Sequence, residues 1–179
     1  MLNRNFIQEE LNRFADKVVT NAKKNLASSN SNFTKDLSNS ISHPPAKISG
    51  AGNIVSVSFD MEEYGAYQDQ GVRGVGGVRK TTSKFKSTNN KGKLWRQKAP
   101  KDTPFSFKKD KPIPAIVFED WAKKKGLNPF AVAISVWRQG LEPKRFFTDA
   151  FDEAFETLPD EIVEAFALQV DDFLDFTRQ

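Results

Sequence analysis

Residues 61–74 read MEEYGAYQDQGVRG, and this stretch links a half-buried strand to a long basic segment. Asp60 and Glu63 have the spacing of a capping box, which predicts that a short helix begins here. Gly71 stands where such a helix requires a left-handed residue at its end. Two tyrosines share one face of this helix and are expected to anchor it, Tyr64 and Tyr67. The predicted order is therefore strand, short helix and a glycine exit into the basic segment.

The chain before this stretch predicts two helices and a pair of strands. Residues 4–27 carry apolar side chains at three-to-four spacing, which is the pattern of an amphipathic helix. A shorter helical element follows at 34–42. Apolar and polar residues then alternate across 53–60, which predicts a half-buried strand that pairs with 46–49 through a tight turn.

The chain after the basic segment predicts further helices. Residues 114–125 form one, and residues 129–139 form a second that is apolar almost all round. We therefore expect the second to be the most buried helix, with Trp137 inside. Residues 144–179 hold an acidic pair of helices whose phenylalanine-rich stripes are typical of a core. The predicted fold class is α+β, a small antiparallel sheet packed with several amphipathic helices in a single domain over 1–179.

Residues 78–112 form a basic arm inserted after the central strand and helix. Between Arg73 and Lys111, thirteen basic residues stand against two acids, a local charge of +11 in a chain of net charge +4. So few aliphatic residues cannot offset the entropy of ordering, so we expect the arm to be mobile in a free subunit and to order on assembly. Its candidate contacts to a neighbouring subunit or to DNA are Arg79, Lys80, Lys84, Phe85, Lys86, Lys91, Lys93, Trp95, Arg96 and Lys98.

Two roles for the arm remain open at this point. Cations interleaved with aromatic residues, here Phe85 and Trp95 among others, are typical of surfaces that bind single-stranded nucleic acid. No common DNA- or RNA-binding signature accompanies them. An extension that wraps a neighbouring subunit has the same composition. Because residues 149–179 carry a charge of −9, one subunit offers both a positive and a negative segment.

The residues argue against catalysis. The chain has no cysteine and one histidine, His43, so it lacks the ligands of a common zinc site and the parts of a catalytic triad. The glycine-rich run 71–77 lacks the Gly-Lys-Ser/Thr ending of a P-loop. No secretory leader or membrane-spanning run is evident, so we expect a protein that works inside the cell or in an assembly made there. We expect no enzyme activity, no cofactor and no metal.

The order of motifs resembles the tail-completion or neck proteins of tailed bacteriophages. In that family a tyrosine-rich block ending in an acidic residue and glycine follows the central strand, as YGAYQDQG does here at 64–71. A passage of the form Arg/Lys-x-Gly-x-x-Pro-x-x-Phe-Phe leads into the final helix, as RQGLEPKRFF does at 138–147. The similarity covers roughly residues 32–151. The motif residues are Tyr64, Tyr67, Asp69, Gly71, Gly140, Pro143, Phe146 and Phe147.

The resemblance implies an α+β subunit that assembles into a ring of six or twelve copies at the joint between phage head and tail. Such a ring seals or extends the DNA channel. Its implied partners are a head-side connector or adaptor, a tail terminator, tube or sheath protein, and packaged DNA, with no membrane partner. The protein would belong to the virion and assemble in the cytoplasm of the bacterial host. The competing hypothesis is a non-enzymatic nucleic-acid-binding protein that uses the arm.

Overall fold

The computed structural model describes residues 4–29, 35–48, 55–77, 94–160 and 162–163. Its contacts gather in two compact units, whereas the sequence predicts a single domain. Unit 1 comprises residues 1–65 and 145–179, and unit 2 comprises residues 66–144. Within the described residues each unit combines helices with one two-stranded antiparallel sheet, so the α+β class is confirmed.

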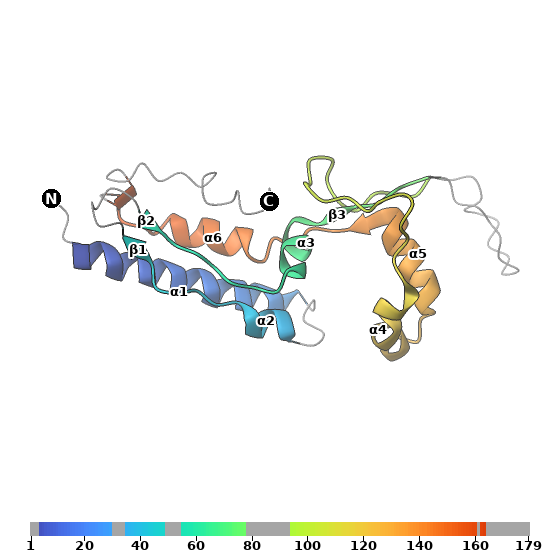
Figure 1. Ribbon diagram of the computed structural model, residues 1–179, viewed down its shortest axis with the longest axis horizontal. Helices are drawn as coiled ribbons and strands as arrows, with labels where there is room; N and C mark the ends of the chain where they lie inside the picture. The colour runs from blue at the N-terminus through green and yellow to red at the C-terminus, as the bar shows by residue number, and fades with distance from the viewer. Residues whose placement is uncertain (1–3, 30–34, 49–54, 78–93, 161, 164–179) are drawn as a thin grey trace, which may run out of the picture. The chain divides into compact units, whose positions relative to one another are not determined.

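Unit 1 is built around one long helix. This helix, α1, confirms the amphipathic helix predicted for 4–27, because its buried residues recur at three-to-four spacing. The last helix that the structure describes, α6, packs along it (Figure 1). The elements of unit 1 are α1 (Arg4–Ser28), α2 (Asp36–Ser40), β1 (Lys47–Ile48), β2 (Val55–Ser56) and α6 (Thr148–Phe155).

The predicted strand pair is present but short. Ile48 lies opposite Val55 in the antiparallel pair of β1 and β2, and the predicted turn between the strands lies outside the described residues. Beyond Ser56 the ladder stops, yet the alternation of half-buried and exposed residues continues to Asp60. The predicted capping box at Asp60 is wrong, because its backbone N–H and C=O instead bond to Ser42, at 2.8 and 2.9 Å. The strand therefore ends as an extended segment laid on the core.

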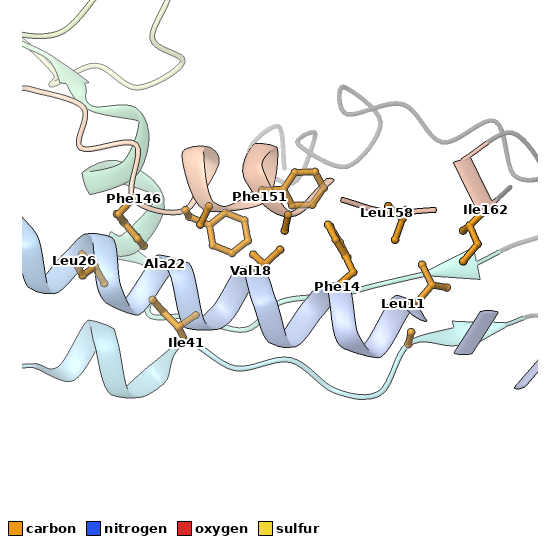
Figure 2. Close-up of a cluster of buried hydrophobic side chains, with 14 of the residues drawn as sticks. Leu11, Phe14, Val18, Ala22, Leu26, Ile41, Phe146, Phe151, Leu158 and Ile162 are labelled. Carbon is orange, nitrogen blue, oxygen red and sulfur yellow. The ribbon is translucent and has the colours of Figure 1, made fainter. Parts of the chain in front are cut away.

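Phenylalanine rings fill the core of unit 1. Phe151, 1% exposed, meets Phe14 edge-on at a centroid distance of 5.2 Å, and Phe147 meets Phe59 in the same way at 5.2 Å. Figure 2 shows Phe151 pointing from α6 toward α1, between Val18 and Phe14. The stripe predicted in the first helix of the acidic pair is thus core. The second helix of that pair falls mainly on residues 164–179, which lie outside the described residues.

Unit 2 is built on a small sheet with helices attached. Val72 pairs with Leu141, and Arg73 pairs with Gly140, across the antiparallel strands β3 and β4. Helix α3 runs into β3, and Gly71 between them has a positive φ of 77°, as predicted. The elements are α3 (Tyr64–Gln70), β3 (Val72–Arg73), the 3-10 turn η2 (Ala115–Phe118), α4 (Glu119–Lys124), α5 (Pro129–Gln139) and β4 (Gly140–Leu141).

Two predictions for the helices of unit 2 need correction. The helix predicted over 114–125 divides into η2 and α4. Helix α5 has the predicted bounds, and the side chain of Asn128 accepts the N–H groups of Phe130 and Ala131 at its start. It is not the most buried helix, however, because Ala133 is its only buried residue and Trp137 is half-buried. The small unit has too little surface to cover a helix that is apolar all round.

Candidate functional site

Several of the motif residues named in the sequence lie where the paired strands β3 and β4 approach closely. A Cβ added at Gly71 would come within 2.7 Å of the Leu141 carbonyl oxygen and 2.9 Å of Pro143 Cδ. A Cβ added at Gly140 would overlap the carbonyl oxygen of Val72. The adjoining helix α3 buries Asp69, which is 3% exposed. These positions are therefore required for backbone packing within unit 2.

The remaining motif residues divide between core and surface. Phe146 and Phe147 are 1% and 2% exposed in the core of unit 1. Tyr64 is 37% exposed and Tyr67 is 43% exposed. The expectation that this pair anchors α3 is therefore wrong for the parts of the two side chains that face solvent. The ring of Tyr67 does meet Phe105 edge-on at 4.6 Å. Most of the motif residues therefore contribute to the packing of the fold rather than to a chemical site.

The second half of the predicted arm belongs to the fold of unit 2. We call residues 94–108 the strap. Arg73 N–H donates to Phe105 O at 2.8 Å, and Phe107 N–H donates back to Arg73 O at 2.9 Å, so the strap adds a third line of backbone beside β3. Lys98 N–H donates to Gln139 O at 2.8 Å on the side of α5. These bonds correct the expectation that all of 78–112 orders only on assembly.

Gln97 connects the strap to both neighbouring segments. Its Oε1 accepts from Gly74 N–H and its Nε2 donates to Arg138 O, both at 2.9 Å. The Arg138 guanidinium in turn donates to Gly76 O at 3.0 Å. One amide side chain thus accepts the N–H of Gly74 and adds a second donor to Arg138 O, which also accepts from Gly76 N–H at 3.0 Å. Composition could not reveal this role, since it depends on contacts between residues far apart in the sequence.

Three of the ten arm residues proposed from sequence are described by the structure. Trp95 is half-buried and its N–H donates to Gly77 O at 3.0 Å, while Arg96 and Lys98 expose their side chains. Phe105 and Phe107 are half-buried, so they have little free ring face for stacking on bases. The other candidates lie outside the described residues, namely Arg79, Lys80, Lys84, Phe85, Lys86, Lys91 and Lys93.

The surface of unit 2 is basic. Residues 66–144 contain eighteen Lys and Arg against six Asp and Glu, whereas the remainder of the chain contains nine against seventeen. Unit 2 therefore carries a formal charge of +12 and unit 1 a charge of −8, which sum to the +4 of the whole chain. The exposed cations of β3, the strap and the segment after it are Arg73, Arg96, Lys98, Lys101, Lys108, Lys109 and Lys111. A field of this sign attracts acidic protein surfaces and phosphates alike.

Unit 2 also exposes large apolar side chains, and one of them, Phe130, belongs to the helix that was expected to be the most buried. We call them the exposed apolar cluster. The exposed fractions run from 38% to 71%, in the order Trp121, Leu127, Val117, Phe130 and Ile116. They come from η2, α4, α5 and the turn between the helices, which pack against one another (Figure 1). The sequence shows that these side chains are apolar, but it does not show how much of the unit is available to cover them.

A hollow lies between two parts of this cluster. It has a volume of about 290 Å³ and is lined by Ile116 and Phe130, together with Ala115, Glu119, Asn128 and Pro129. Helix α4 ends in Lys123 and Lys124, followed by Lys125, all exposed. Lys123 bonds to Glu119 at 2.7 Å, and that contact raises the pKa of its ammonium group above the ordinary value. An apolar hollow beside a basic helix end suits an amphipathic, acidic partner better than a small polar ligand.

The titratable side chains of the described residues were compared with the arrangements that metal sites require. No three His, Cys, Asp or Glu side chains among them gather closely enough to hold a metal ion. His43 bonds to Asp16 at 3.1 Å and to Pro44 O at 3.0 Å, which accounts for both of its ring nitrogens. In the part of the chain that is described, no helix combines the length and apolarity needed to cross a membrane. Comparison of the chain with family models, with curated proteins and with solved structures finds no match.

Proposed function

We propose that this protein is a structural subunit of a bacteriophage neck, which works by assembling with copies of itself into a ring at the joint between head and tail. The observation that carries the proposal is the exposed apolar cluster on unit 2. Monomeric proteins seldom expose several large apolar side chains close together, and such surfaces mark contacts with other proteins. The order of the phage-like motifs along the chain also supports the proposal.

The exposed apolar cluster supplies part of the free energy that an assembly needs. Each cluster residue is partly covered already, so completing its burial contributes about 1–2 kcal/mol, and the five together roughly 5–10 kcal/mol. Association itself costs an estimated 4–15 kcal/mol, model-dependent. The cluster is therefore enough to begin an interface but not to complete one. A ring supplies the rest, because every subunit then makes two contacts.

The positions of the motif residues are consistent with this role. Gly71, Gly140 and Pro143 shape the backbone that carries unit 2, and Phe146 with Phe147 fills the core of unit 1. A motif devoted to shape is what a structural subunit needs, since its task is to present surfaces. An enzyme would instead need titratable groups converging on a cleft. We therefore propose no catalytic activity and no cofactor.

The mass of the purified full chain tests this proposal. We expect native mass spectrometry to show one closed oligomer at an integral multiple of the subunit, and electron microscopy to show rings. Phe130→Asp, which places a charge in the exposed cluster, should shift the population to monomers, since its exposed site leaves the fold intact. Leu94→Asp is the matched control, because Leu94 is 74% exposed in the same unit but outside the cluster.

A chain that stays monomeric and binds duplex DNA would favour the alternative. In that case affinity should fall steeply with salt, because each phosphate contact releases a counterion. Substituting exposed cations such as Arg96 and Lys98 should then weaken DNA binding, while Phe130→Asp should leave it unchanged. Those results together would replace the ring by a nucleic-acid-binding protein.

A further inference from the structure

We infer that the exposed apolar cluster of one copy is occupied by residues 164–179 of a neighbouring copy. This inference rests on the proposed function and gives the ring its contact. Two features of the molecule point to it: the chemistry of the cluster with its basic surroundings, and the complementary pattern in that segment of sequence. They are taken in turn.

The cluster offers an apolar seat with cations beside it. Ile116 and Phe130 line a hollow of about 290 Å³, and both are more than 60% exposed. Lys123, Lys124 and Lys125 follow directly along α4, in a unit whose formal charge is +12. A partner for this seat must bring apolar side chains spaced for a groove, and it must be acidic overall.

Residues 164–179 meet both requirements by sequence. They read EAFALQVDDFLDFTRQ, with four acids and one base, a charge of −3. If helical, the segment places Phe166, Val170, Phe173 and Leu174 on one face, at the three-to-four spacing of helices that bind in grooves. Its acids then lie away from this face, where they are drawn to the cations of unit 2 without entering the hollow. The apolar face accounts for affinity and the acids for the rate of encounter.

The acidic segment and the basic seat are different parts of the chain, so their pairing between copies can run head to tail. A head-to-tail interface repeats with the same rotation from copy to copy and closes into a ring when that rotation divides a full turn. The charges of the two units support the same direction, because unit 1 at −8 is attracted to unit 2 at +12 of the next copy. A two-fold dimer in which the segment of each copy occupies the seat of the other would make the same contact, so the mass of the oligomer decides between a pair and a ring.

Disulfide trapping can test the pairing, because the chain contains no cysteine of its own. One sample of the full chain carries Phe130→Cys. A second, of different isotopic mass, carries a single cysteine at Phe166, Val170, Phe173 or Leu174. The two are mixed and oxidised, and the linked species are identified by mass. Because each chain holds one cysteine, a heavy–light product joins two copies.

We expect heavy–light links between Phe130→Cys and at least one of the four apolar-face variants, at ten times or more the yield of two controls. The first control is Leu94→Cys in place of Phe130→Cys, and the second is Asp175→Cys on the opposite face of the segment. Equal yields in the controls, or no link at any of the four positions, would overturn the inference. So would a chain carrying Phe130→Cys and Phe173→Cys that links only within itself.

A second measurement separates this inference from the proposed function. Deleting residues 164–179 should weaken self-association at least tenfold, as loss of a central apolar contact does. Raising the salt should slow association of the full chain and have less effect on the deleted one. If the deleted chain forms rings as readily as the full chain, the ring stands and the inference falls. If the full chain forms no oligomer, the proposed function fails and the inference with it.

Discussion

Gly140 shows how one residue determines whether unit 2 can form. Its backbone has φ 82° and ψ −176°, a region that is almost exclusive to glycine, and it lies against the backbone of Val72 and Gly74. Gly140→Ala should therefore cost about 3 kcal/mol or more, since strain and overlap add. Denaturation followed by tryptophan fluorescence measures this, because all three tryptophans, Trp95, Trp121 and Trp137, lie in unit 2.

Gly126 provides the matched control for this prediction. It also has a positive φ, 65°, but nothing lies within 4 Å of where a Cβ would stand. Gly126→Ala should therefore cost only the left-handed conformation, about 1–2 kcal/mol. Equal losses of unfolding free energy for Gly140→Ala and Gly126→Ala would show that the close approach of the paired strands β3 and β4 contributes nothing to stability.

Phe151 has the corresponding importance in unit 1. It is 1% exposed and its ring meets those of Phe14, Phe59 and Phe155. Phe151→Ala should lower the free energy of unfolding by about 3–5 kcal/mol, because a large cavity opens in a packed core. Phe6→Ala, at a residue 38% exposed on α1, should cost much less. Far-UV circular dichroism measures both changes, and a loss below about 1 kcal/mol for Phe151→Ala would place the core elsewhere.

At the scale of elements, the strap of unit 2 is held in place by hydrogen bonds to residues far away in the sequence. Removing the Gln97 side chain leaves Gly74 N–H without its acceptor, at an expected cost of about 1–3 kcal/mol. Gln97→Ala should also speed hydrogen exchange at Trp95, Lys98 and Phe107, whose amides bond within the unit. Arg96→Ala, at an exposed neighbour in the strap, is the control. Fast exchange of these three amides in the unaltered free subunit would contradict the placement of the strap.

The elements that sequence predicts well are those specified by local signals. The periodicity of α1, the Asn128 cap with Pro129 that opens α5, and the glycine after α3 all depend on neighbouring residues. The strap does not, because it is ordered by backbone bonds to Arg73 and Gln139 from a segment with few apolar residues. The composition of the strap predicted a mobile segment, but hydrogen bonds to residues distant in the sequence hold it in place.

The candidate site was only half predictable for a related reason. Periodicity identifies which side chains are apolar, but it does not say how much partner surface exists to cover them. Phe130, on the helix expected to be the most buried, therefore lies exposed. The basic character of the region could be read directly from the residues, since charge needs no partner to be counted. Which apolar side chains remain exposed is known only once the fold shows which of them it buries.

At the scale of the whole molecule, the chain combines two units of opposite charge, +12 and −8. A single count of net charge, +4, conceals this separation. We propose that the opposite signs attract one copy to the next and that the exposed apolar side chains of unit 2 strengthen this association. The proposed function is then fulfilled in an assembly.

Immunogold electron microscopy of intact phage particles tests the neck assignment most directly. Under the proposal a phage genome encodes the chain, so particles of that phage are labelled with an antibody against it, beside particles from a phage with an unrelated neck as the control. We predict label at the joint between head and tail, on particles that still hold both parts. Intact, infectious particles that contain none of the protein would contradict the account.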